Sequence, residues 1–248
     1  MKNVFNFLLI LISMNVCYSQ SLDSLPVSRI NDTILSKYLN EKRSIEIQLP
    51  RSYDLESDKN YPLMIVLDGD YMFNIVSGST DYLSYWGDIP ENLVVGINQR
   101  ETRFKDTSVF DNLTFTPITS TASFFDFIVN ELIPYISKNY RVSDFKVIVG
   151  QERTANFANF FLLKPNPLIR GVISISPKLS DKMDIYLSEN LSNTNSKIIY
   201  TISSSKKDFE TIYNNVTALS NSLDSINNKN LKFKSIIFND ENHYILPS

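Results

Sequence analysis

A stretch in the second half of the chain has the spacing of a nucleophile site but lacks the nucleophile. Residues 146–149 form a short, mostly β-branched run, Gly150 follows, and an apolar pattern at helical spacing continues to Leu162. A strand, a sharp turn and a helix form the setting in which the pattern G-x-S-x-G exposes a catalytic serine. Here Glu152 occupies the serine position and Thr154 the last glycine position. The stretch therefore predicts the scaffold of an acyl-transfer site without its attacking hydroxyl.

The elements that would position this turn alternate between strands and helices. Residues 42–50 alternate apolar and polar side chains, as in an antiparallel strand with one face in water. Short, mainly apolar runs typical of buried strands lie at 62–67, 93–97, 171–177 and 197–202, and a last strand is expected at 231–238. Helical spacing of apolar residues predicts helices over 123–139 and 209–226, and residues 71–86 are expected to be partly helical.

This alternation predicts an α/β fold with a mostly parallel, doubly wound sheet and helices on both of its faces. No linker, internal repeat or low-complexity block divides the chain, so residues 20–248 are predicted to form one domain. Residues 98–121 are polar and aromatic without a clear period. Such a long connection is typical of a functional loop.

The first 19 residues predict a secretory signal peptide, with Lys2 as its positive start, an apolar run at 5–12 and cleavage before Gln20. One alternative is a membrane anchor, but the apolar run is short of the roughly 20 residues that span a bilayer. Another is a lipoprotein acylated at Cys17, for which the preceding Asn15 and Val16 are a poor match. The chain is therefore expected to be exported, to the periplasm or outside the cell, with no transmembrane segment once the signal is removed.

Composition excludes several classes of site. The 248 residues carry a formal net charge of −3 and no dense run of Lys and Arg, which argues against a nucleic-acid partner. Cys17 is the only cysteine and would leave with the signal peptide, so thiol catalysis and cysteine metal sites are excluded from the mature chain. A single histidine excludes a histidine-rich metal site, and no cofactor is expected.

Five segments, in this order, resemble the esterase D-type and enterochelin-esterase-like enzymes of the α/β-hydrolases. They lie at 43–53, 61–69 (Y-P-L-M-I-V-L-D-G), 95–97 with 116–117, 127–141 (including E-L-I-P-Y-I) and 242–243. The resemblance covers nearly all of the predicted mature chain and implies an α/β-hydrolase fold with the site of a serine carboxylesterase. The turn of these enzymes is usually G-H-S-x-G-G, from which this chain departs at Gln151, Glu152, Thr154 and Ala155.

The resemblance also implies roles for the remaining site residues. In serine hydrolases a histidine takes the proton of the attacking hydroxyl, and a carboxylate orients that histidine. His243 stands at the position of the catalytic histidine, and Asp208 is the first choice for the carboxylate, with Glu210 second. The backbone N–H groups that would stabilise an oxyanion map to Arg153 and to Asp70 or Tyr71. A surface charge, for Asp208 and Glu210, and an incidental tail histidine, for His243, are the simpler alternatives.

Glu152 leaves two chemical interpretations open. Some α/β-hydrolases attack with a carboxylate at this position, and a histidine-activated water then hydrolyses the resulting ester. Alternatively, Glu152 forms an ion pair with Arg153. Replacement serines at Ser174, Ser176 or 203–205 are discounted, because a serine outside the sharp turn lacks the exposed placement of a nucleophile.

Three functions remain compatible with these residues. The favoured one is an exported pseudo-esterase that binds a small ester-like ligand or a protein partner in the remaining cleft. Aromatic residues could line that cleft, namely Tyr82, Tyr85, Trp86, Phe104 and Phe110. The alternatives are a working carboxylic-ester hydrolase with an atypical nucleophile, and a structural subunit of a cell-envelope complex.

Overall fold

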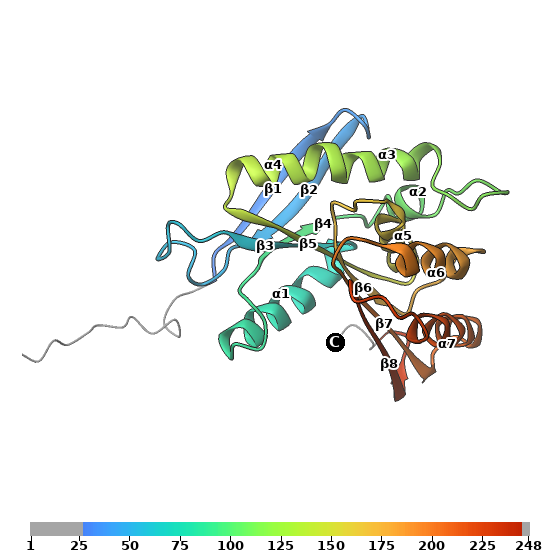
Figure 1. The fold of residues 1–248 in the computed structure, drawn as a ribbon. Coiled ribbons are helices and arrows are strands. Elements are labelled where there is room, and N and C mark those ends of the chain that lie inside the picture. Colours follow the sequence, from blue (N-terminus) through green and yellow to red (C-terminus); the bar gives the residue numbers. More distant parts are fainter. Residues whose placement is uncertain (1–26, 245–248) are drawn as a thin grey trace, which may run out of the picture.

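The computed structural model describes residues 27–244, which form one eight-stranded sheet with helices on both faces (Figure 1). The signal peptide predicted at 1–19, with Cys17 and the cleavage site before Gln20, lies outside the described residues. The strand order is β1-β2-β4-β3-β5-β6-β7-β8. The strands are β1 (Arg29–Ser36), β2 (Glu41–Gln48), β3 (Tyr61–Val66), β4 (Leu93–Ile97), β5 (Val142–Gln151), β6 (Gly171–Ile175), β7 (Ile198–Lys207) and β8 (Leu231–Asn242).

Parallel pairing joins the six strands from β4 to β8 across the sheet, and only the β1–β2 and β2–β4 pairs are antiparallel. Parallel sheets are covered on both faces, which explains the unbroken apolar run of β3. Leu63 and Ile65 belong to the core on one side of the sheet, and Met64 and Val66 to the core on the other. The predicted α/β-hydrolase fold, with a mostly parallel sheet, is confirmed.

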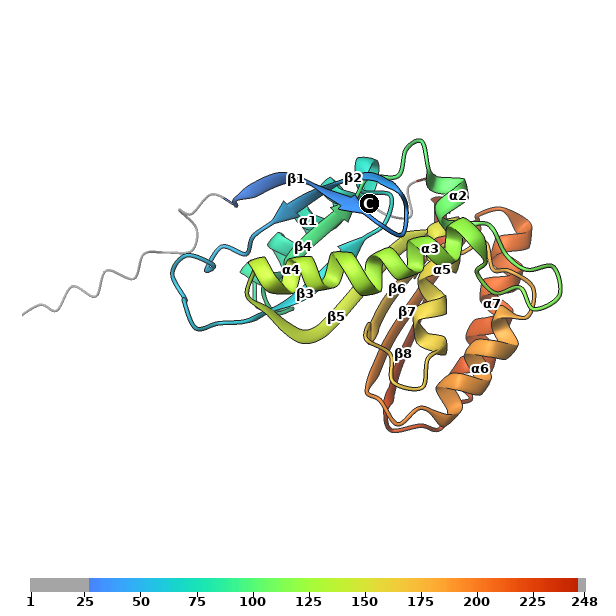
Figure 2. The ribbon, with the colours of Figure 1, turned by 90° about the horizontal axis from the view of Figure 1, so that it is seen from above.

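The helices divide unequally between the two faces (Figures 1 and 2). Helix α1 (Gly69–Tyr85) packs on β2, β3 and β4 from one side. The other face carries the larger core and the remaining long helices. These are α3 (Thr119–Phe127) with the π turn Ile128–Leu132 and α4 (Ile133–Asn139), α5 (Arg153–Asn159) with the 3-10 turn Phe160–Leu163, α6 (Met183–Asn193) and α7 (Glu210–Asp224).

Several elements differ from the sequence-based expectation. The edge strand β1 lies in a stretch for which the sequence predicts no strand, because Asn31 and Asp32 are poor strand formers and half of its residues face water. Helices α2 (Arg103–Thr107) and α6 are also unexpected. The last two strands extend further than predicted, to Lys207 and Asn242. Among residues 27–244, no helix is both long and apolar enough to cross a bilayer.

Candidate functional site

Glu152 lies at the sharp bend between β5 and α5, as the sequence predicts. Its backbone has φ 55° and ψ −107°, a conformation that non-glycine residues rarely adopt. Its N–H donates to the carbonyl of Ile175 on the neighbouring strand β6 (3.0 Å). Gly150 is required by the same bend, because an added Cβ would lie 2.6 Å from the backbone carbon of Thr154. The bend therefore keeps the strained geometry that presents a side chain at the carboxyl edge of the sheet.

Thr154, which replaces the last glycine of the pattern, fastens the bend to the turn before α1. Its buried hydroxyl accepts the N–H of Gln151 (3.0 Å) and lies 2.8 Å from Oδ2 of Asp68. Asp68 is itself buried, with 1% of its surface exposed. The substitution of glycine by threonine thus adds a hydrogen-bonded link between two turns at the site.

Arg103, at the start of α2, is the cation that holds Glu152. Its Nη1 donates to Oε2 of Glu152 (2.9 Å), its Nε to Oδ1 of Asp68 (2.8 Å), and its Nη2 to the carbonyl of Gln151 (3.0 Å). The predicted ion pair with Arg153 is present but longer, at 3.7 Å from Nε to Oε1 of Glu152. Glu152 therefore lies between two arginines, of which Arg103 makes the direct hydrogen bond.

Burial and charge act in opposite directions on this cluster. Burial raises the pKa of Asp68 above its ordinary value, although Arg103, Thr154 and the Tyr71 hydroxyl oppose the shift. For Arg103, burial lowers the pKa, but the charges and hydrogen bonds of Asp68 and Glu152 outweigh it and leave the pKa raised. Arg103 is therefore a permanent cation, and it compensates the two carboxylates on either side of it.

Asp208 and His243 lie together at the ends of β7 and β8. Nδ1 of His243 is 2.8 Å from Oδ1 of Asp208, whose side chain is fully buried. Burial alone would raise the pKa of Asp208, but hydrogen bonds from Ser176, Ser204 and His243 prevail and lower it. Asp208 is thus held as a carboxylate that can orient the imidazole. Glu210, the second choice for this position, is the exposed first residue of α7.

The serines near the strand ends support Asp208. Ser176, buried and with φ 47°, donates its hydroxyl to Oδ2 of Asp208 and lies 3.0 Å from Nδ1 of His243. Ser204 also donates to Oδ2 of Asp208 (2.8 Å). The Ser176 hydroxyl thus lies beside Nδ1 of the imidazole, the nitrogen that Asp208 also contacts. A nucleophile would have to meet Nε2 instead.

A cavity of about 280 Å³ joins the bend to the histidine. It is lined by Tyr71, Ile75, Arg103, Gln151, Glu152, His243 and Tyr244. Gln151 Nε2 donates to the carbonyl of His243 (2.9 Å), and the rings of Phe209 and Tyr244 pack against the imidazole. Because Asp208 holds Nδ1, the nitrogen left for a molecule in the cavity is Nε2.

The predicted oxyanion donors are the backbone N–H groups of Arg153 and of Asp70 or Tyr71. The backbone of Arg153 opens α5 beside Glu152, as an oxyanion donor would, but the Tyr71 N–H donates to the carbonyl of Asp68 (3.1 Å). The Asp70 carboxylate accepts the N–H of Gln99 (3.0 Å).

The aromatic residues expected in the cleft lie elsewhere: Tyr82, Trp86 and Phe104 are more than 60% exposed, Tyr85 is at the end of α1, and Phe110 stacks on Phe160. Among residues 27–244, no three potential metal ligands cluster.

Comparison with known proteins places this geometry in a family. The family model described as "Putative esterase" matches residues 36–230. An uncharacterised protein from Capnocytophaga ochracea superposes with a TM-score of 0.79 at 23% identity, over 89% of this chain and 61% of that one. An IroE-like serine hydrolase from Shewanella oneidensis gives 0.76 at 22% identity, over 89% of this chain and 76% of the other.

A third similar structure, the BES protein from Bacillus cereus, gives a TM-score of 0.75 at 20% identity, over 88% of this chain and 90% of the other. No curated protein matches the chain by sequence. Identities this low show the common fold and leave the activity of this chain to be inferred from its own residues.

Proposed function

The chain belongs to this esterase family of α/β-hydrolases, and from that premise we propose that it is a pseudo-esterase. In this proposal the fold and the Asp208–His243 pair are retained, acyl transfer is lost, and the cavity binds a small ester-like molecule. The observation that carries it is the position of Arg103, which ties the Glu152 carboxylate where the attacking hydroxyl of a serine hydrolase would stand.

Both oxygens of the Glu152 carboxylate face a cation. One oxygen accepts a charge-assisted hydrogen bond from Arg103, and the other faces Arg153. Such bonds are roughly twice as strong as neutral ones, and they withdraw the lone pairs that an attack on an acyl carbon would need. A carboxylate also leaves an acyl centre far more readily than an alkoxide, so any acyl adduct on it would collapse back.

The cavity favours a small ligand. Its volume of about 280 Å³ lies just below the usual range of ligand pockets. Tyr71, Ile75 and Tyr244 give it apolar walls, while Arg103 and His243 provide donors for a carbonyl or a carboxylate. We therefore expect short esters, or the acids they contain, to be the ligands.

The test measures turnover and binding separately. Wild-type protein should not hydrolyse p-nitrophenyl acetate above the rate of heat-denatured protein, but should bind butyrate or methyl butyrate by isothermal titration calorimetry. Glu152→Gln should strengthen butyrate binding, because the amide competes less for Arg103. Binding that is indifferent to both Glu152→Gln and His243→Ala would place the ligand elsewhere and end the proposal.

A second candidate rests on the cavity that Glu152 and His243 share. In it, a Glu152 oxygen attacks an alkyl carbon, the leaving group departs with its bonding electrons, and an alkyl ester forms on Glu152. His243 then removes a proton from water, and the resulting hydroxide hydrolyses that ester. Mass spectrometry after incubation with an epoxide or alkyl halide would reveal the adduct. The hydrogen bond from Arg103 to Glu152 makes this the weaker candidate.

We also propose that the chain is exported after cleavage before Gln20. The support is the order of Lys2 and the apolar residues 5–12 at the N-terminus. The mass of the protein recovered from periplasm or medium checks it: an N-terminus at residue 20 is expected, whereas a lipid-modified Cys17 would indicate an acylated form. A pull-down from the producing cell would reveal an envelope partner.

A further inference from the structure

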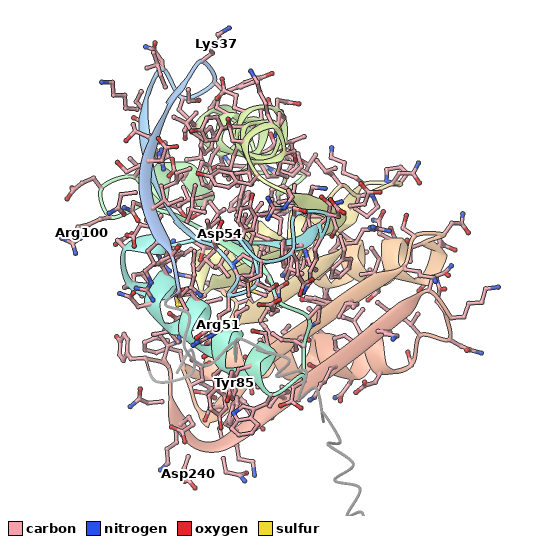
Figure 3. All side chains as sticks on the ribbon, turned by 90° about the vertical axis from the view of Figure 1, so that its left-hand side faces the viewer. Lys37, Arg51, Asp54, Tyr85, Arg100 and Asp240 are labelled. Carbon is pink, nitrogen blue, oxygen red and sulfur yellow. The ribbon has the colours of Figure 1, made fainter. Side chains whose placement is uncertain are left out.

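One face of the C-terminal half of the sheet has no described helix over it. Helix α1 packs on β2, β3 and β4, whereas α5 and α7 cover β5 to β8 from the opposite side. Figure 3 looks at the molecule from the α1 side, where Tyr85 marks the end of α1 and Asp240 the far end of β8.

An apolar groove of about 230 Å³ runs along this face. Its walls include Met64, Ile89, Phe145, Val147, Ile173 and Ile199. Ile199 is 43% exposed although β7 is an inner strand of the sheet. Parallel sheets are ordinarily covered on both faces, so apolar side chains exposed here lie where another element would be expected to pack.

An aromatic projection stands beside the groove. Trp86, the only tryptophan of the chain, caps the end of α1 and is 64% exposed. The rings of Tyr82 and Tyr85 contact it edge-on, with centroids 6.4 and 5.1 Å away. The turn that follows Trp86 supplies Ile89 to the groove wall. The projection and the groove therefore belong to one surface, and exposed tryptophan and tyrosine are the residues that dominate binding energy at interfaces.

Opposite charges flank the groove. In the β7–β8 register, Lys232 pairs with Ile199 and Lys234 with Thr201, so both lysines point to the groove side of the sheet. Asp88, exposed between Trp86 and Ile89, lies on the other flank. Within the described part of the chain, none of these three charges takes part in an ion pair.

We propose that this face binds a second copy of the chain in a symmetric dimer, with Trp86 of each copy in the groove of the other. A two-fold contact requires one surface to complement itself. This surface carries both a projection and a groove, and both an acid and a pair of lysines, which such an axis would bring together. Tyr82 and Trp86 are each 64% exposed, so a partner that covers them would bury aromatic surface of the kind that dominates the energetics of interfaces.

Sedimentation equilibrium and tryptophan emission test the dimer. Because Trp86 is the only tryptophan, its emission reports this face alone, and it should shift to shorter wavelength as the protein concentration rises about a hundredfold through the dissociation constant. Trp86→Ser and Ile199→Asp should each weaken dimerisation at least about tenfold. Leu113→Ser is the matched control, because Leu113 is 79% exposed on a loop away from the groove and should leave the dimer intact.

Charge reversal identifies the contact itself. Asp88→Lys should weaken the dimer, the pair Lys232→Glu and Lys234→Glu should do the same, and the triple variant should recover it. All are surface positions, and circular dichroism verifies that each variant is folded. A chain that stays monomeric at every concentration, a dimer insensitive to Trp86→Ser and Ile199→Asp, or an emission shift seen only with lipid vesicles would overturn the proposal.

Discussion

Nη1 of Arg103 lies 2.9 Å from Oε2 of Glu152, and Nε of the same guanidinium lies 2.8 Å from the buried carboxylate of Asp68. One cation thus joins the bend after β5 to the turn after β3. Through Arg103, the acid at position 152 is thus connected to both turns.

Loss of Arg103 should therefore be costly. Arg103→Ala leaves the Asp68 charge buried without its partner, so the free energy of unfolding should fall by about 2–3 kcal/mol, less than for a fully buried pair because Arg103 is 27% exposed. Arg153→Ala is the matched control and should cost at most about 1 kcal/mol, since its contact with Glu152 is long and partly exposed. Urea unfolding measures both. Equal losses of unfolding free energy in the two variants would contradict the stabilising role of the Arg103 contact with Asp68.

The contribution of Asp208 should depend on pH. Its folded pKa is lowered, so the folded state binds fewer protons at this group and the carboxylate stabilises the fold above its unfolded pKa of about 3.9. The stability gap between wild type and Asp208→Asn should be constant at neutral pH and shrink as the pH falls below about 4. Thermal unfolding across this range measures the gap. A gap that widens on acidification would contradict the hydrogen-bond arrangement around Asp208.

Two glycines should respond in opposite ways to the same substitution. Gly150→Ala places a methyl group within 2.6–2.8 Å of the backbone of Thr154 and Ala155, which cannot move without opening the bend, so we expect a loss of several kcal/mol, on the order of 3 or more. Gly78→Ala, within α1, meets nothing within 4 Å and should stabilise by about 0.5–1 kcal/mol. Chemical denaturation gives both values. A tolerated Gly150→Ala would mean that the bend is looser than described.

The sequence predicts the frame of the site well because local patterns encode it. The apolar run of β3 and Gly150, two residues before Glu152, are local signals, and each predicts an element that the structure contains. Asp208 and His243 follow from the resemblance, which implies an acid after the penultimate strand and a histidine after the last, and the structure brings the two side chains together. Their catalytic roles stay predictions.

The contacts that decide the chemistry leave no such pattern. Arg103 lies 49 positions before Glu152, in the polar and aromatic stretch 98–121 that has no clear period. No local pattern near either residue therefore predicts that the two side chains form a pair. The sequence predicts no role for Ser176, because its hydrogen bond to Asp208 depends on a turn with φ 47° at Ser176 that no local pattern predicts. Asp68 had a usable signal: a polar residue directly after a buried parallel strand points to the carboxyl edge, where sites of this fold class lie.

Labelling of position 152 tests the central claim most directly. Wild type, His243→Ala, Glu152→Ser, and Glu152→Ser combined with His243→Ala are each treated with a fluorophosphonate, and the modified residue is located by mass spectrometry. We predict no labelled serine in wild type, labelling at position 152 in Glu152→Ser, and loss of that labelling when His243 is also changed. Stoichiometric labelling of any serine in wild type, abolished by His243→Ala, would show that the chain has a working nucleophile and is not a pseudo-esterase.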